Sequence, residues 1–225
     1  MELIIDTSTK YATLAISNQG ELVSELSWES NRNHSVELLP ALWELLNLRG
    51  YSKNVFEAVV VATGPGSFSS VRVGMSTAKS FAAGADLPIV GIPTILAETI
   101  PYSGLGSRVM GLIPAGGRRV YSGILEDGRD SIELYELIDT EKSFVNAGQE
   151  TIVCGEAVHK LVSAGILKKD NLVIDIPPPT RRASVMARYG LSKIQSGNVD
   201  DPALLEPVYV RSAQIESAER NRKKI

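Results

Sequence analysis

The chain has 225 residues, 44% of them hydrophobic and 22% charged, with a formal net charge of -3 and a pI near 5.5. These values are those of a folded globular protein rather than a disordered chain, and the acidic balance argues against autonomous nucleic-acid binding through a basic face. The single cysteine, Cys154, excludes an internal disulfide and a cysteine metal cluster. Since the apolar runs are far shorter than a membrane span and the first residues do not resemble a signal peptide, we expect a cytoplasmic protein without membrane contact.

The first hundred residues predict strands and helices in the order β-β-β-α-β-α-β. Three short apolar runs separated by polar turns are typical of an antiparallel meander. The β-branched run from Glu57 to Thr63 is typical of a buried parallel strand. Asn33 or His34 can begin the first helix, with Glu37 in its first turn. The expected strands are 2–6, 12–17, 21–28, 57–63 and 87–91, and the expected helices are about 34–48 and 69–84.

The second half begins with the same pattern of strand, turn and strand. Aligning Ile5–Tyr11 with Ile113–Arg119 places strand on strand and turn on turn. We therefore interpret the chain as two copies of one unit, a β-meander followed by helices. Clustered proline and glycine near 94–106 suggest the boundary between the copies. We therefore expect a first lobe over 1–100, a second lobe over 101–212 that ends in a helix near 183–194, and a basic tail over 213–225.

The turn Asp6-Thr7-Ser8-Thr9 directly follows the first strand. Two-domain ATPases of the actin and sugar-kinase type hold phosphates and magnesium at such a turn, because hydroxyl and N–H groups bind phosphate and a carboxylate orients a metal-bound water. The same residues also suit a plain hairpin in which the aspartate accepts hydrogen bonds from turn amides. Both interpretations stay open, and Asp6, Thr7, Ser8 and Thr9 are the candidate nucleotide-binding residues of a degenerate site.

A complete nucleotide cleft of this class needs a second phosphate loop from the second lobe. The aligned position is Pro114, which has neither a carboxylate nor an N–H donor. Half of the phosphate clamp is therefore predicted to be missing, which argues against kinase or ATPase chemistry. The sequence has no P-loop, G-x-S-x-G elbow or paired-histidine metal motif, and His34 and His159 lie far apart. We expect no catalytic residue and no metal site.

The two helices of the first lobe carry more apolar surface than one core-facing stripe needs. In the second helix, Gly74, Ala78 and Ala82 recur every four residues and would let another helix approach closely. This pattern suits either a subunit interface or helices buried inside the lobe. For a partner interface we predict a set of residues from both helices: His34, Leu38, Leu39, Leu42, Val71, Gly74, Met75 and Ala78.

The run from Ala62 to Gly74, which contains Gly64-Pro65-Gly66-Ser67-Phe68, is the most specific of several family-like segments. The others are Met1–Thr9, Asn33–Pro40, Leu87–Gly91 and Leu205–Arg211. Together they resemble the TsaB (YeaZ-like) family, closely over residues 1–95 and sparsely from there to about 200. The chain departs from the family in having Ser69-Ser70 where Thr-Gly is usual, and Pro114-Ala115-Gly116 where an Asp-Ala-Arg-like stretch is usual.

The resemblance implies an α/β fold of the actin-like ATPase and ribonuclease H-like class, with two related lobes whose mixed sheets are flanked by helices. It implies a non-catalytic subunit that binds and supports a TsaD-like catalytic subunit, together with a TsaE-like ATPase, in transferring threonylcarbamoyl to an adenosine of tRNA. It also implies a homodimer when the chain is alone, contact with tRNA through the complex, and no required cofactor beyond weak ATP or ADP binding at the partner interface. The alternatives are a small ATP-dependent kinase or ATPase of the actin-like class and a peptidase.

Overall fold

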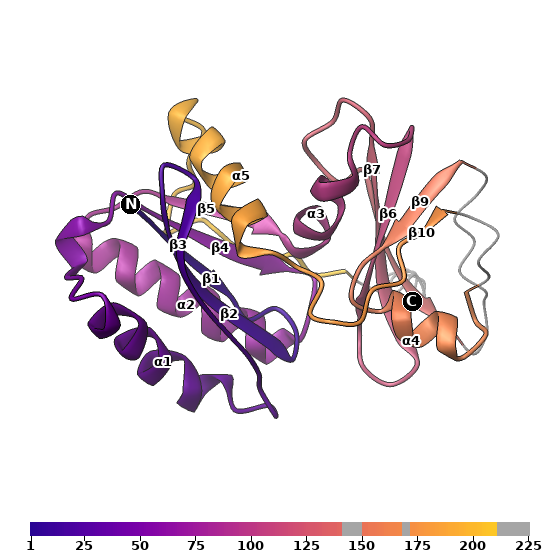
Figure 1. The fold of residues 1–225 in the computed structure, drawn as a ribbon, viewed down its shortest axis with the longest axis horizontal. Helices are drawn as coiled ribbons and strands as arrows, with labels where there is room; N and C mark the ends of the chain where they lie inside the picture. Colours follow the sequence, from indigo (N-terminus) through magenta and orange to yellow (C-terminus); the bar gives the residue numbers. More distant parts are fainter. Residues whose placement is uncertain (141–149, 168–171, 211–225) are drawn as a thin grey trace, which may run out of the picture.

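The computed structural model describes residues 1–140, 150–167 and 172–210. They form two lobes side by side, each built on a five-stranded sheet (Figure 1). The first half contains β1 (Glu2–Asp6), β2 (Tyr11–Asn18), β3 (Glu21–Glu29), α1 (His34–Leu48), β4 (Ala58–Gly64), α2 (Phe68–Ala85), β5 (Ile89–Pro93) and α3 (Thr94–Thr99). The second half contains β6 (Arg108–Pro114), β7 (Arg119–Glu126), β8 (Leu134–Asp139), β9 (Thr151–Cys154), α4 (Val158–Ser163), β10 (Leu172–Val173) and α5 (Ala183–Gln195). Short 3-10 turns lie at Lys53–Val55 and Ile100–Tyr102.

The first sheet has the strand order β3-β2-β1-β4-β5, in which β1 pairs antiparallel with β2 and parallel with β4. Every residue of β1 and β4 is buried, as expected of near-continuous apolar runs in central strands. Because successive side chains point to opposite faces, Leu3 and Ile5 pack with α1 and α2 while Ile4 packs with α5. Helices α1 and α2 therefore cover one face of this sheet and α5 covers the other (Figure 1).

The second sheet has the order β10-β9-β6-β7-β8, and β6 pairs antiparallel with β7 and parallel with β9. This arrangement repeats the first sheet strand for strand, with β6 and β7 in the places of β1 and β2. The predicted internal repeat is confirmed, and the strand order of both lobes is that of the actin-like ATPase and ribonuclease H-like class. Helix α4 covers one face of the second sheet, where Val158 and Leu161 pack with Leu112.

Two helices pack against the sheet that they do not follow in the sequence. α3 comes directly after β5 of the first sheet but lies mainly on β6, where a Cβ at Gly111 would come within 2.8 Å of Ile95 Cγ2. α5 comes after β10 of the second sheet but lies on the first, where a Cβ at Gly190 would come within 2.3 Å of Val60 Cγ2. The absence of a side chain at both glycines therefore permits the crossed packing.

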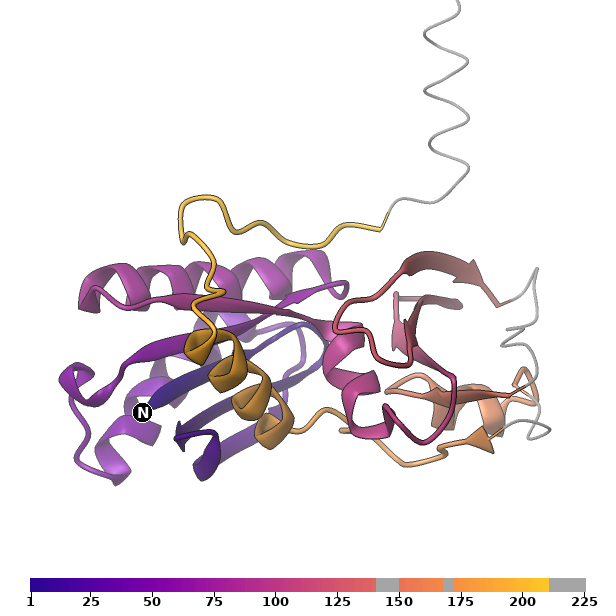
Figure 2. The same cartoon turned by 90° about the horizontal axis from the view of Figure 1, so that it is seen from above.

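The chain stays on the first lobe after α5 and passes beside α2 (Figure 2). The N–H of Asp200 donates to the carbonyl of Ile89 over 2.9 Å, and that of Val208 donates to the carbonyl of Thr63 over 2.8 Å. The assignment of 101–212 to the second lobe is thus wrong for residues 183–210, because α5 fills the open face of the first sheet. The predicted basic tail at 213–225 lies outside the described residues. Within the described ranges, no helix combines the length and apolar character needed to cross a membrane.

Candidate functional site

The Asp6–Thr9 turn lies at the end of β1, where the two lobes meet, and all four of its residues are buried. Ser8 donates from its N–H and its Oγ to Asp6 Oδ1, over 2.8 and 2.6 Å. Thr7 Oγ1 donates to the carbonyl of Ser70 over 2.6 Å, and Thr9 Oγ1 donates to Glu156 Oε2 over 2.7 Å. The three hydroxyl groups that the sequence offered to a phosphate therefore all have partners inside the protein.

The glycine-rich loop between β4 and α2 closes over this turn. Ser67 donates its N–H to the carbonyl of Ser8 over 2.8 Å. A Cβ on Gly66 would lie only 2.0 Å from the same carbonyl oxygen, so a larger residue at 66 would push the loop away from the turn. The close approach of the two backbones leaves the Asp6–Thr9 turn covered on this side.

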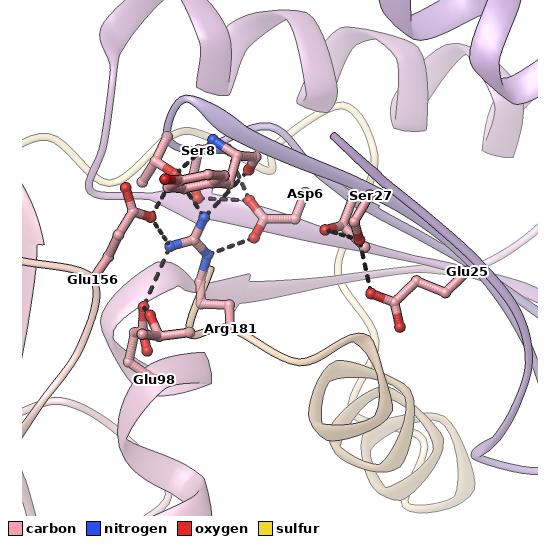
Figure 3. A network of polar contacts seen from close by, with 11 residues as sticks. Asp6, Ser8, Glu25, Ser27, Glu98, Glu156 and Arg181 are labelled. Atoms are coloured by element: carbon pink, nitrogen blue, oxygen red, sulfur yellow. Dashed lines mark hydrogen bonds and ion pairs between the residues drawn. The ribbon is translucent and has the colours of Figure 1, made fainter. Parts of the chain in front are cut away.

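An arginine from far along the chain fills the space beside the turn. Arg181 lies in the segment that crosses from β10 to α5, and its side chain is 5% exposed. Its guanidinium donates from Nε to Asp6 Oδ2 over 2.6 Å, from Nη1 to Glu156 Oε2 over 2.8 Å, and from Nη2 to Thr9 Oγ1 over 2.8 Å. A longer contact of 3.3 Å joins Nη1 to Glu98 Oε1. Figure 3 shows the three carboxylates converging on this one cation.

The carboxylates come from three parts of the fold: Asp6 ends β1, Glu98 lies in α3, and Glu156 follows β9. Burial raises the pKa of Glu98 to about 7, although Arg181 and the hydroxyl of Thr180 act in the opposite direction. Burial alone would lower the pKa of Arg181, but the carboxylates, Asp6 foremost, raise it above its ordinary value. The guanidinium is therefore permanently charged, and the cluster holds more carboxylate than cation.

A nucleotide polyphosphate does not fit this arrangement. An incoming phosphate would meet buried carboxylates at close range, and like charges repel strongly where water is excluded. In the second lobe, the turn between β6 and β7 begins at Pro114, which has no N–H to donate. In the part of the chain that the structure describes, no group of three His, Cys, Asp or Glu residues is placed to hold a metal ion. The described contacts join the two lobes, and they engage the hydroxyl and carboxylate groups of the Asp6–Thr9 turn.

Most of the predicted interface residues lie in the interior of the first lobe. The buried ones are His34, Leu38, Leu42, Val71, Gly74, Met75 and Ala78. In the single chain these side chains are not open to a partner, because Leu38, Leu42, Val71, Met75 and Ala78 belong to the hydrophobic core between the helices and the sheet. Gly74 is small to make room for Thr7, whose Oγ1 would lie 2.3 Å from a Cβ at that position. His34 Nδ1 shares a 3.2 Å hydrogen bond with Ser70 Oγ, and Leu39 is the exposed member of the set.

A second apolar stripe of α1 faces away from the sheet. Val36, Leu39 and Trp43 are 69%, 60% and 71% exposed, and their spacing of three and four residues places them on one side of the helix. We call these three residues the α1 stripe. Beside it, between α1 and α2, lies a shallow pocket of about 310 Å³ lined in part by Leu39 and Arg72. Groups of large exposed apolar side chains mark interaction sites on folded proteins, so the α1 stripe is the candidate contact surface.

Sequence reasoning missed the residues that complete the site between the lobes: Glu98, Glu156 and Arg181. Local features point to two of them, Glu98 and Arg181. Glu98 follows the apolar run Ile95-Leu96-Ala97, and the whole of α3 is buried, which is unusual for a charged residue without a partner. Arg181 and Arg182 stand directly before α5, where positive charge opposes the helix dipole and needs another explanation. No comparable pattern marks Glu156.

Known proteins match this chain along most of its length. Residues 26–133 match the family model described as "TsaD: tRNA N6-adenosine threonylcarbamoyltransferase". The chain is 26% identical to the tRNA threonylcarbamoyladenosine biosynthesis protein TsaB of Bacillus subtilis, over 96% of each chain. It is 32% identical to the Escherichia coli protein of the same name, over 53% of this chain and 52% of that one. The solved structure of YeaZ from Pseudomonas aeruginosa has a similar fold, with a TM-score of 0.73 and 19% identity over 93% of this chain and 99% of that chain.

Proposed function

This chain belongs to the TsaB (YeaZ-like) family, and from that membership we propose that it acts in tRNA threonylcarbamoyladenosine biosynthesis as a non-catalytic subunit. It binds and supports a TsaD-like catalytic subunit, works together with a TsaE-like ATPase, and meets tRNA through the assembled complex. When it is alone, it forms a homodimer. It requires no cofactor, and a weakly bound ATP or ADP belongs at the partner interface rather than between its own lobes.

The observation that carries the non-catalytic role is the occupied space at the Asp6–Thr9 turn. In an actin-like ATPase this place receives phosphates, whereas here the Arg181 guanidinium lies against Asp6 and Thr9. The hydroxyls of the turn are bound within the chain, and the matching turn of the second lobe starts with Pro114. These contacts engage the hydroxyl groups and the carboxylate of the turn that would otherwise bind or activate a phosphate.

The α1 stripe supports the proposed partner contact. A row of large apolar side chains on one side of a helix favours packing against an apolar groove or helix of another protein. The pocket beside Leu39 could accept a side chain from such a partner. Aromatic residues contribute strongly to interfaces, so Trp43 is the best candidate for an anchor within the stripe.

The alternatives fit the site less well. An actin-like kinase or ATPase would have to bind phosphate against three carboxylates, after displacing Arg181 from its hydrogen bonds. A peptidase would need a nucleophile and a base open to substrate, but Ser70 and His34, which are hydrogen-bonded to one another, are both buried.

Co-expression with a TsaD-like and a TsaE-like subunit tests the proposal. We expect a stable complex of this chain with the TsaD-like subunit, and threonylcarbamoyladenosine in tRNA that depends on this chain. The isolated chain should not hydrolyse ATP, and Asp6→Ala should leave that baseline unchanged. Strong ATP hydrolysis by the isolated chain that disappears in Asp6→Ala would instead establish the ATPase alternative.

A further inference from the structure

We propose that Arg181 is an internal latch between the lobes, in which its guanidinium takes the place of a bound ligand and holds the two lobes together from within. The latch consists of this guanidinium and its partners, which are the side chains of Asp6, Thr9, Glu98 and Glu156 and the carbonyl of Tyr11. It goes beyond the proposed function, because it concerns how this chain maintains its own shape and does not depend on a partner subunit or on tRNA.

The guanidinium reaches both lobes in different directions. Nε and Nη2 contact Asp6 and Thr9, which lie at the end of β1 and in the following turn of the first lobe. Nη1 contacts Glu156 in the second lobe, in the loop between β9 and α4. Nη1 also lies 3.3 Å from Glu98 of α3, the helix that follows the first sheet and packs on the second. One planar group therefore joins both sheets and the helix between them (Figure 3).

The residue before Arg181 strengthens the same junction. Thr180 Oγ1 donates to Glu98 Oε1 over 2.6 Å. Thr180 and Arg181 belong to the segment that returns the chain from the second lobe to the first, directly after the three prolines at 177–179. Because proline fixes its own φ and restricts the preceding residue, the stretch that leads into Thr180 and Arg181 has restricted conformational freedom.

The contacts require an arginine. A guanidinium presents donors in one plane from three nitrogen atoms, and here each nitrogen has its own oxygen acceptor, whereas a lysine ammonium is a single point of charge. Moving the lobes apart would separate the buried Arg181 guanidinium from Glu156 or from Asp6. An unpaired buried charge is strongly unfavourable. The closed arrangement is therefore maintained by the chain's own residues, in a place where a ligand would otherwise bridge the lobes.

Truncation of the latch gives a direct test with a defined probe. Arg181→Ala in the full chain should leave a space of guanidinium size lined by three carboxylates. We expect hydrogen–deuterium exchange to become faster at 6–11 and at 155–157, the segments that the latch joins. Free guanidinium at low-millimolar concentration, far below its denaturing range, should restore protection there and raise the Tm of Arg181→Ala without raising that of the wild type.

A matched control is Arg188→Ala, which removes an arginine of α5 whose ion pair with Glu21 is exposed. It should change neither the exchange at these segments nor the response to guanidinium. Wild-type exchange at both segments in Arg181→Ala, or an equal guanidinium effect on the two variants, would overturn the latch.

If Arg181→Ala does not fold, Glu156→Gln decides the question. This change removes the charge of the second-lobe anchor and keeps an amide oxygen that can accept the hydrogen bonds. Faster exchange at both 6–11 and 155–157 in Glu156→Gln supports the latch, because loosening one anchor loosens the other. Exchange that stays at the wild-type rate in both segments excludes it.

Discussion

Nε of Arg181 and Oδ2 of Asp6 lie 2.6 Å apart, although 175 positions separate the two residues in the sequence. Both side chains are almost completely buried, so the bond is shielded from water. A buried charge that loses its partner destabilises a protein by about 3–5 kcal/mol. Removal of either partner at this site should therefore appear as a loss of stability.

Asp6→Ala should lower the free energy of unfolding by about 3 kcal/mol, because it leaves the Arg181 guanidinium without its shortest contact. For a chain of this size, the Tm measured by circular dichroism should fall by roughly 6–12 °C. Asp130→Ala is the control, since Asp130 pairs with Lys193 over 2.8 Å but is 75% exposed. Its cost should stay below about 1 kcal/mol. Equal effects of the two changes would mean that the site adds no more than a surface pair.

The stability of the chain should depend on pH through Glu98, whose pKa is about 7 in the folded protein against an ordinary value of 4.5. The folded state binds this proton more tightly than the unfolded state does. The contribution of Glu98 is therefore complete below pH 4.5 and is lost as the pH rises to about 7. The loss should be on the order of 3 kcal/mol.

Urea unfolding between pH 5 and 8 checks this dependence, with Glu98→Gln as the comparison. The glutamine variant has no proton to lose, so its stability should change less over this range than that of the wild type. A wild type that gains stability relative to Glu98→Gln as the pH rises would contradict the raised pKa.

Leu39→Glu should weaken both the homodimer and binding to a TsaD-like subunit by at least about tenfold, because it places a charge in the middle of the α1 stripe. Folding should be retained, since Leu39 is 60% exposed in the single chain. Leu105→Glu is a matched control, because Leu105 is 68% exposed and lies in the loop before β6, away from α1. Sedimentation velocity and co-purification measure the difference. An interface elsewhere is indicated if the two variants associate equally well.

Gly74→Ala should destabilise the chain by about 1–3 kcal/mol, because the new Cβ would lie 2.3 Å from Thr7 Oγ1. Gly84→Ala, in the same helix, meets no atom within 4 Å and should be neutral or stabilising by up to about 1 kcal/mol. Thermal unfolding of the two variants gives the comparison. Gly74→Ala should be detected as a loss of stability, and not as a selective loss of association in a well-folded chain.

The strands were the most predictable part of the fold. The run Ala58–Gly64 is buried throughout and forms an interior strand between β1 and β5, as its run of β-branched residues indicated. The repeat of strand, turn and strand gave the correspondence between β1–β2 and β6–β7. Local spacing could not give the crossed packing of α3 and α5, because that depends on small residues, Gly111 and Gly190, in contact with distant segments.

The site was only half predictable for the same reason. The Asp6–Thr9 turn is contiguous and could be recognised, but its partners Glu98, Glu156 and Arg181 are brought to it by folding alone. The predicted interface set mixed residues from two apolar stripes of α1. The stripe with Leu38 and Leu42 packs on the sheet, and the α1 stripe is the exposed one. Helical periodicity identifies both and does not say which one a sheet will cover.

The position of α5 also sets the order in which the chain can fold during synthesis. β5, the last strand of the first sheet, ends at Pro93, whereas α5, which covers one face of that sheet, ends at Gln195. At the usual rate of translation, the ribosome needs roughly 5–20 s to make the residues in between. During that interval the side of the nascent sheet that carries Ile4, Val60 and Ala62 lacks α5, whose Met186 and Ala187 pack against it in the folded protein. The first lobe is therefore synthesised first but completes its packing only after the second lobe has been made. A messenger truncated before the α5 codons yields a polypeptide whose apolar sheet face is open to aggregation.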